Sequence, residues 1–334
     1  MIHRHTHRDR RHVLIGSLLA GLAILPIALM VGPAHIGGPQ ILACLGGHAD
    51  PQIRTILFDI RLPRMALAFL VGMALAISGT VFQGLLMNPL AGPYTLGISS
   101  GAAFGASMAI FLGMSAWIFP IAALLGAGLS LGTVLALSRA QGDIDSRSLV
   151  LAGIVIGSIF SAAISLVKSL SGESLSTIVF WIMGSLSGRG WADVGAALPY
   201  LLVGVTGIIV WSRDLDLLCM GDDHAHSAGV DIVATRRLLL FFASLTAAAA
   251  VSVSGVIGFV GLVVPHAVRI LAGPAHRPLA LLSALSGGVL LLYADTLARA
   301  LSYAGDIPVG VVTALLGGPF FCILLAKGRP FRNI

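Results

Sequence analysis

Charged side chains are scarce in this sequence. Only 10% of its 334 residues are Asp, Glu, Lys or Arg, whereas 57% are hydrophobic. A typical soluble domain has about a quarter of its residues charged and needs them to cover its surface. Apolar runs recur along the chain, and runs of about 20 residues are what a helix needs to cross the ~30 Å hydrocarbon core of a membrane. The composition therefore predicts a membrane protein with little room for a separate soluble domain.

Sequence patterns typical of enzymes and of metal sites are also scarce. Glu173 is the one glutamate, and no GxxxxGK[ST] phosphate-binding loop occurs. Cys44, Cys219 and Cys322 are not spaced as CxxC, so three free thiols are expected, with neither a metal site nor a disulfide framework. We predict that the chain has no catalytic residue and binds no metal or cofactor of its own.

The apolar runs predict an all-α membrane protein with about ten transmembrane helices. The run from Val13 to Val31 is longer than the ~7–15 apolar residues of a secretory signal, so we expect it to be the first membrane helix. A single transmembrane domain, residues 13–327, is expected between cytoplasmic tails, the basic residues 1–12 and residues 328–334. The predicted helices cover residues 13–32, 62–86, 95–113, 117–138, 148–170, 193–212, 236–255, 259–272, 278–300 and 308–327.

Positive charges outnumber negative ones and give a formal net charge of +6. The Lys and Arg residues lie at the ends of apolar runs and are not interleaved with aromatic residues, so nucleic-acid binding is not predicted. Cytoplasmic loops of membrane proteins are enriched in Lys and Arg. With these helices, 14 of the 20 Lys and Arg residues fall on one side. That side, with both termini, is therefore predicted to be cytoplasmic.

Two stretches rich in Gly and Pro interrupt the apolar pattern. They read NPLAGPYTLGISSGA from Asn88 to Ala102 and SGVIGFVGLVVPH from Ser254 to His266. Non-helical backbone at membrane depth is stable only where protein or a water-filled cavity covers it. Because paired interruptions are typical of inverted repeats, residues 60–170 and 236–327 are predicted to be related in this way. The residues singled out in these stretches are Asn88, Pro89, Gly92, Pro93, Gly97, Gly258, Pro265 and His266.

The longest polar stretch inside the chain runs from Ser212 to Arg237 and reads SRDLDLLCMGDDHAHSAGVDIVATRR. It falls on the predicted cytoplasmic side. Packed helices need a connection of only ~2–8 residues. A longer, charged connection with helical stretches favours a docking surface, which we predict over residues 213–235. A solvated loop without a partner is the alternative.

Charged residues in or beside membrane helices are candidates for function. Asp295 and Arg299 are four residues apart and share a helix face. They can form an internal ion pair that fixes the helix end, or serve transport. Arg61, Arg64 and Arg299 fall on the outer side, where positive charge is disfavoured. Because guanidinium groups bind carboxylates through two parallel hydrogen bonds, an acidic patch on an external partner is the favoured complement, and lipid phosphate is the alternative.

Seven ordered motifs cover almost the whole chain from Arg61 onward. They are RLPR (Arg61–Arg64), Gln83 with NPLAGPYTLGISSGA (Asn88–Ala102), LVLAGI (Leu149–Ile154), FWIMGSL (Phe180–Leu186), IGFVGLVVPHAVR (Ile257–Arg269), ADTLAR (Ala294–Arg299) and DIPVGVVTALLGGPFF (Asp306–Phe321). In their order and content they closely resemble the FecCD/BtuC-type permeases of ATP-binding-cassette (ABC) importers for iron chelates, haem and cobalamin.

The resemblance implies ten membrane helices per subunit and a homodimer with the translocation path on its two-fold axis. It implies two copies of a separate ATPase inside, which would bind ATP and magnesium, and a substrate-binding protein outside. It also implies location in the cytoplasmic (inner) membrane of a bacterium or archaeon. The expected cargo is an iron–siderophore first, and haem or cobalamin next.

The same resemblance assigns roles to individual residues. Arg61, Arg64 and Arg299 resemble receptors for glutamates of the binding protein. Gln83 and Trp181 belong to motifs near the translocation path, and Ser146 and Arg147 match a cytoplasmic gate. The residues implied to contact the ATPase are Gly221, Asp222, Asp223, His224, Ala228 and Gly229.

The chain departs from its relatives in the ATPase-contacting segment, where His224, His226 and Ala228 replace a charge-rich ERAxxLG-like stretch. The alternative function is an ion-coupled secondary transporter of a small solute. Such a protein needs acids or unwound carbonyls at an ion site near the membrane midplane. For such a site this chain offers Asp295, near one end of a predicted membrane helix, and little else. A membrane scaffold needs no cavity, so the interrupted segments argue against it.

Overall fold

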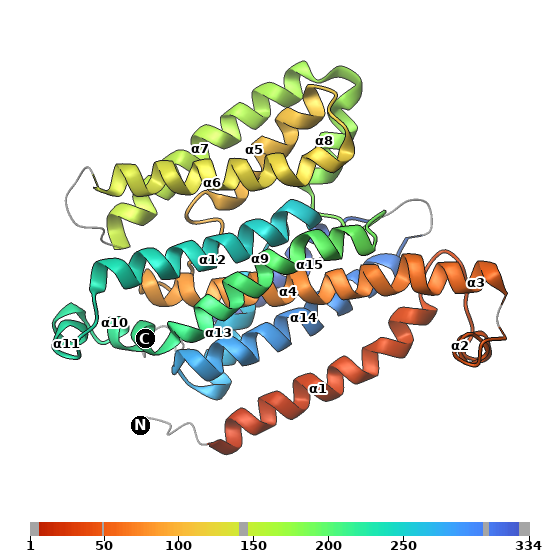
Figure 1. The fold of residues 1–334 in the computed structure, drawn as a ribbon, viewed down its shortest axis with the longest axis horizontal. Coiled ribbons are helices and arrows are strands. Elements are labelled where there is room, and N and C mark those ends of the chain that lie inside the picture. Colours follow the sequence, from red (N-terminus) through yellow and green to blue (C-terminus); the bar gives the residue numbers. More distant parts are fainter. Residues whose placement is uncertain (1–6, 49, 140–145, 303–306, 327–334) are drawn as a thin grey trace.

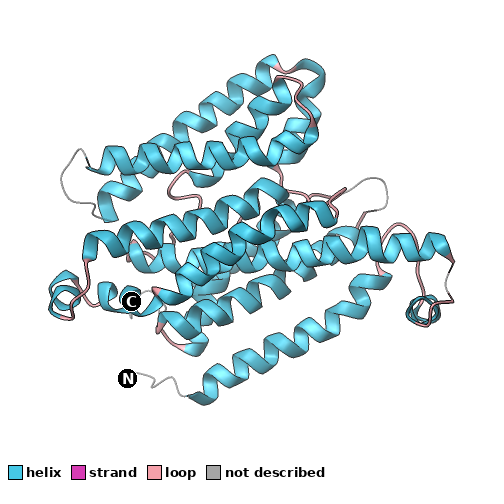
Figure 2. Ribbon diagram, viewed as in Figure 1, coloured by secondary structure: helices cyan, strands magenta, loops and turns pink. Residues whose placement is uncertain are grey.

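Helices make up the computed structural model, which describes residues 7–48, 50–139, 146–302 and 307–326, and no strand occurs among these residues (Figure 2). In order they are α1 (His7–Met30), α2 (Gly38–Leu45), α3 (Pro51–Thr55), a π-helical turn (Ile56–Arg61), α4 (Leu62–Leu85), α5 (Ile98–Phe111), a 3₁₀ turn (Ala116–Ile118), α6 (Phe119–Arg139), α7 (Ser146–Leu170), a 3₁₀ turn (Gly172–Ser174), α8 (Leu175–Ile182), α9 (Trp191–Val210), α10 (Ser212–Cys219), α11 (Asp222–Ser227), α12 (Ile232–Ser254), α13 (Val260–Ala272), α14 (His276–Ala300) and α15 (Val309–Ala326).

Each predicted membrane helix corresponds to a helix of the structure, but their lengths differ. By length and composition, seven described helices can cross a membrane, and three shorter apolar helices cover Ile98–Phe111, Val260–Ala272 and Val309–Ile323. Ten crossings therefore stay a prediction. The predicted tail 328–334 and residues 1–6 lie outside the described residues, and α1 begins at His7, inside the range predicted as a tail.

The buried centre of the fold consists of α4, α12 and α14 (Figure 1). α4 packs against both of the others, and α12 lies between α4 and the group formed by α5 and α6. α1 packs along α14 on the opposite side. In Figure 1, α1 begins at the same end of the molecule as α10 and α11, and α2 and α3 lie at the other end.

Glycines allow the central helices to approach closely. A Cβ atom added at Gly72 of α4 would lie 2.2 Å from the carbonyl oxygen of Gly287 in α14. One added at Gly79 would lie 1.8 Å from the carbonyl oxygen of Gly261 in α13. Small residues at helix crossings are typical of membrane proteins, because lipid gives no hydrophobic drive for helix association and van der Waals packing must supply it.

The helix that contains α4 is longer than predicted, because it begins at Pro51 and not near residue 62. Residues Pro51–Leu85 form 35 residues of continuous helix, or about 52 Å at 1.5 Å per residue. Pro63 has no backbone N–H and its ring crowds the carbonyl four residues earlier. The preceding turn, Ile56–Arg61, is π-helical, and the N–H of Leu62 bonds to the oxygen of Leu57. The wider turn accommodates the proline without ending the helix.

The order of elements is the same in the two halves that were predicted to be related. α4 is followed by an interruption, the short helix α5, then α6 and α7. Similarly, α12 is followed by an interruption, the short helix α13, then α14 and α15. The inverted symmetry between the halves stays a prediction.

Candidate functional site

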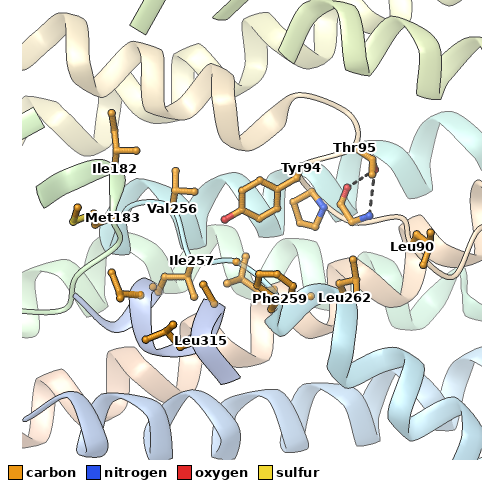
Figure 3. Close-up of a pocket in the computed structure, with 18 residues that line it drawn as sticks. Leu90, Tyr94, Thr95, Ile182, Met183, Val256, Ile257, Phe259, Leu262 and Leu315 are labelled. Carbon is orange, nitrogen blue, oxygen red and sulfur yellow. Dashed lines mark hydrogen bonds between the residues drawn. The ribbon is translucent and has the colours of Figure 1, made fainter. Parts of the chain in front are cut away.

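A cavity of about 640 Å³ lies where both interrupted segments meet (Figure 3). Residues 90–95 and 256–262 form two of its walls. Residues 182–183 at the end of α8, residues 310–315 at the start of α15 and Leu75 of α4 complete the described lining. Among the described residues that line the cavity, only Tyr94 and Thr95 have polar side chains. The cavity therefore offers a bulky ligand an almost entirely apolar surface.

Side chains replace helical hydrogen bonds in the first interrupted segment. The Asn88 side-chain oxygen accepts from the backbone N–H of Leu90 at 2.9 Å. The Thr95 hydroxyl donates to the Gly92 oxygen at 2.6 Å and accepts from the Gly92 N–H at 3.2 Å. Asn and Thr often satisfy nearby backbone groups outside helices in this way. These bonds keep residues 88–95 folded without a helix.

The second interrupted segment is held against the first. Gln83 of α4 donates from its side-chain nitrogen to the Leu262 oxygen at 3.0 Å. A Cβ atom added at Gly261 would lie 3.4 Å from the Pro93 ring, and one added at Gly258 would lie 3.7 Å from the Tyr94 hydroxyl. The two segments therefore pack on each other as well as lining one cavity.

Backbone contacts bring the other two walls to the same place. The N–H of Gly310 donates to the oxygen of Gly184 at 3.1 Å, and the N–H of Ser185 donates to the oxygen of Ser254 at 2.8 Å. A Cβ atom added at Gly255 would lie 2.1 Å from the Trp181 oxygen. The end of α8, the end of α12 and the start of α15 are thus joined at the cavity.

Some of the residues predicted near the path line this cavity and others do not. Gly92, Pro93 and Gly258 line it. Gln83, Asn88 and Trp181 brace its walls, and Pro89 follows Asn88 in the same segment. Gly97 instead begins α5 and accepts a hydrogen bond from Ser130 of α6, while Pro265 and His266 are buried within α13.

The sequence prediction missed Tyr94, Phe259, Met183 and Leu315, which also line the cavity (Figure 3). Tyr94 belongs to the motif Asn88–Ala102, and its polar hydroxyl group next to Pro93 could have marked it as a candidate cavity residue. Phe259 has a backbone φ of 66°, a left-handed conformation that is rare for a bulky residue. No sequence pattern indicates that conformation at a phenylalanine.

Arg64 and Arg299, two of the three arginines predicted to lie on the outer side, share one carboxylate. Asp295 is completely buried and lies 2.9 Å from Arg64 and 3.1 Å from Arg299, its predicted partner four residues later. Arg299 also donates to the oxygens of Ala28 and Val31 at 2.8 Å. Arg61 donates to the oxygens of Leu29 and Ala34.

Burial limits which of these arginines a docking partner can reach. Arg61 is 4% exposed and Arg299 is 5% exposed. Backbone oxygens at the end of α1 and after it satisfy their donors, which is what keeps buried charges stable. Arg64 has a side chain that is 12% exposed, so it is the member of the cluster that an external carboxylate reaches most easily. The docking role stays a prediction.

The predicted docking segment, residues 213–235, forms two short helices with an exposed tip. Gly221 and Gly229, both with positive φ, bracket α11. Asp222, Asp223 and His224 are exposed, whereas Ala225 is buried and anchors the turn. Asp222 also pairs with Arg236 of α12 at 2.7 Å. The segment therefore presents charged groups outward, and the uncharged Ala228 and Gly229 at its end are also exposed.

The predicted gate residues begin α7. The Ser146 hydroxyl donates to the oxygen of Leu85, the last residue of α4, at 2.9 Å. Arg147 is exposed. Ser146 therefore joins α7 to the end of α4, directly before the first interrupted segment.

Comparison with known proteins identifies the family. The model of the FecCD transport family matches residues 18–327. The chain belongs to the FecCD transport family. It is 46% identical to the cobalamin import system permease protein of Halobacterium salinarum over 84% of this chain and 76% of that protein. It is 39% identical to the hemin transport system permease protein of Yersinia pestis over 95% of this chain and 97% of that protein.

The fold of this FecCD protein also matches a solved structure. A metal-chelate type ABC transporter in an inward-facing conformation is similar with a TM-score of 0.86 and 34% sequence identity. The match covers 95% of this chain and 99% of that one. Together with its apolar helices, membership of the family makes the chain a multi-pass membrane protein of the ABC permease type.

Proposed function

We propose that the chain is the permease subunit of an ABC importer that moves a metal chelate from the periplasm to the cytoplasm. The observation that carries the proposal is the cavity at the meeting point of the two interrupted segments. Non-helical backbone at membrane depth is stable where it is buried in protein or lines a water-filled cavity, as a transport path does. Alternating access would open this cavity to one side of the membrane and then to the other.

A separate ATPase supplies the energy in this proposal. The chain has no phosphate-binding loop of its own, so two ATPase subunits would bind ATP and magnesium. The exposed α10–α11 segment, with Asp222, Asp223 and His224 at its tip, is the surface that we assign to ATPase docking. This assignment places α11 and both termini in the cytoplasm, and the protein in the inner membrane of a bacterium or archaeon.

A second copy of the chain would complete the translocation path. α7 exposes large apolar side chains such as Leu151 and Ile159, and α15 exposes Leu315 and Leu316. Leu315 also lines the cavity, so one side of the cavity wall is an exposed helix. Pairing of two copies along these helices would enclose the path between them, and lipid would cover the remaining apolar surface.

The cargo class rests on the relatives and on the cavity lining. Relatives with comparable identity carry names for cobalamin and for hemin transport, and the solved relative is of the metal-chelate type. An apolar cavity of about 640 Å³ suits a large chelate with an organic shell. An iron–siderophore, haem and cobalamin are the candidates, in the order predicted. A substrate-binding protein would deliver the chelate from outside.

An ion-coupled secondary transporter is the weaker candidate. Asp295, the acid that it would need, is fully buried and occupied by Arg64 and Arg299. An acid paired in this way has no free oxygen pair for a coupling ion.

Co-purification tests the proposal. The tagged chain is expressed with its candidate partner ATPase, and a second strain carries a deletion of residues 221–231. Wild type should retain the ATPase in about equal amounts, and the deletion should lose it while remaining folded in the membrane. Arg189→Glu, at the other end of the molecule, serves as the control that should not change association. If the deletion retains the ATPase in normal ratio, the docking surface lies elsewhere.

A further inference from the structure

Asp216 of α10 caps the start of α14 from outside that helix. Its Oδ1 atom accepts the backbone N–H of His276, the first residue of α14, at 2.8 Å. The same oxygen lies 2.7 Å from the His276 Nδ1 atom. The residue in the local capping position is Ala275, which makes no side-chain cap. Asp216 therefore supplies, from 60 residues earlier in the chain, the oxygen that a Ser or Asp normally provides at a helix start.

The same short helix holds the end of α4. A Cβ atom added at Gly84 would lie 2.7 Å from His276 Nε2 and 3.2 Å from the Leu215 side chain. The thiol of Cys219 lies 3.6 Å from the Gly84 oxygen and donates to it. α10 thus contacts both the last turn of α4 and the first turn of α14.

α10 lies between the predicted docking surface and the part of α4 that leads to the cavity. α11 begins three residues after Cys219, and its tip is exposed. On the other side, α4 ends at Leu85, and Leu90 already lines the cavity. Only the short segment that contains Asn88 lies between the last turn of α4 and the cavity wall at Leu90. Few residues therefore connect the predicted ATPase-docking surface to the cavity.

We propose that the Asp216–His276 contact couples α11 to the cavity by making α10 move as one body with the ends of α4 and α14. This inference rests on the proposed function. Asp216 is a positioning residue, because it acts through His276 and α4 on the cavity wall. A push on α11 by an ATPase would then shift residues 86–95. Without the contact, α10 would lose its hold on α14 and would contact α4 only through Leu215 and Cys219.

The test measures how the cavity responds to nucleotide. Leu315→Cys, in the exposed cavity wall, is labelled with a maleimide in proteoliposomes that contain the whole importer. The labelling of that peptide is followed by mass spectrometry, both without nucleotide and with ATP and vanadate. In the Leu315→Cys importer we expect ATP and vanadate to change the labelling rate on the order of tenfold, within the range typical of coupled sites.

Three variants separate coupling from stability. Asp216→Ala should reduce the nucleotide response below about twofold while the complex still assembles and hydrolyses ATP. Asp216→Asn should keep most of the response, because its carbonyl oxygen still accepts from the His276 N–H. His276→Leu keeps the backbone cap and loses the side-chain bond, so it should give an intermediate response. If the Asp216→Ala complex does not assemble, His276→Leu tests the coupling role in its place.

Asp193→Ala is the matched control. Asp193 likewise accepts from a backbone N–H at a helix start, that of Gly190 at 2.9 Å, and pairs with Arg189 at 3.1 Å. It should leave the nucleotide response unchanged. A full response in Asp216→Ala or His276→Leu, or an equal loss in Asp193→Ala, would overturn the inference. A background complex with no nucleotide response at all would instead contradict the proposed function, and this inference with it.

Discussion

Arg64 of α4 and Asp295 of α14 form an ion pair with 2.9 Å between Nη2 and Oδ1, although 231 residues separate them in the sequence. Arg299 binds the other carboxylate oxygen and the carbonyls at the end of α1. The cluster therefore joins α1, α4 and α14 at the end of the molecule that is remote from α11. Its first role is structural, because its charges are partnered inside the protein.

Removal of the central carboxylate should be costly. Asp295→Ala leaves Arg64 and Arg299 buried without their counter-ion, and breaking one partner of a buried pair typically costs about 3–5 kcal/mol. Asp222→Ala breaks the pair with Arg236 at a side chain that is 52% exposed, where pairs contribute about 0–1 kcal/mol. Unfolding titrations of the purified permease in mixed detergent measure both. Equal losses for the two variants would show that the cluster does not hold the helices together.

The docking role of the arginines is best tested at Arg64. Arg64→Gln should insert normally, because Arg299 still neutralises Asp295. It should weaken binding of the substrate-binding protein by about tenfold at low salt and reduce the salt dependence, since partly exposed charge pairs are screened. Arg54→Gln, an exposed arginine of α3 at the same end, is the control. Unchanged affinity in Arg64→Gln would assign the cluster to helix packing alone.

Close helix crossings give a third prediction. Gly79→Leu should prevent correct packing of α4 on α13, because an added Cβ atom would meet the Gly261 backbone at 1.8 Å. Gly132→Leu places the same side chain on α6 where nothing lies within 4 Å. Gel filtration after detergent extraction should show aggregation or poor yield for Gly79→Leu and a normal peak for Gly132→Leu. A normal peak for both would mean that α4 and α13 do not approach so closely.

The reactivity of Cys219 follows from its surroundings. Burial raises the pKa of the Cys219 thiol to about 11, with a smaller raising effect from Asp216 and an opposing one from Arg269. A raised pKa means that the unreactive thiol dominates below pH 11. Alkylation at pH 7.5 should therefore be much slower at Cys219 than at the exposed Cys322, and should accelerate by about tenfold per pH unit between pH 7 and 9. Peptide mass spectrometry reports both rates, and a fast, pH-independent reaction at Cys219 would refute the prediction.

Local sequence patterns predicted much of this fold but could not predict its long-range contacts. Apolar runs located the main helices, and the Gly- and Pro-rich stretches located Gly92, Pro93 and Gly258 at the cavity. The predicted helix 62–86 begins beside Pro63, because a sequence does not show that a π-helical turn will accommodate this proline within a longer helix. α2, α3 and α8 are short and carry no strong periodic signal, so they were missed.

Burial of charged groups was the least predictable property. The predicted outer position of Arg61 follows from its place beside an apolar run. Its burial depends on the Leu29 and Ala34 carbonyls, which an irregular segment brings to it. The contact of Asp216 with His276 likewise joins two segments with no shared periodicity. Such contacts are set by the tertiary packing of α4, α10 and α14.

Transport by the reconstituted importer tests the central claim most directly. Proteoliposomes that hold the chain, its ATPase and its binding protein are offered a labelled ferric siderophore, haem or cyanocobalamin, with and without ATP. The account predicts accumulation of at least one of these chelates that requires ATP and all three components, and that persists when ion gradients are collapsed. Uptake of a solute by the chain alone, driven by an ion gradient and indifferent to ATP, would contradict it.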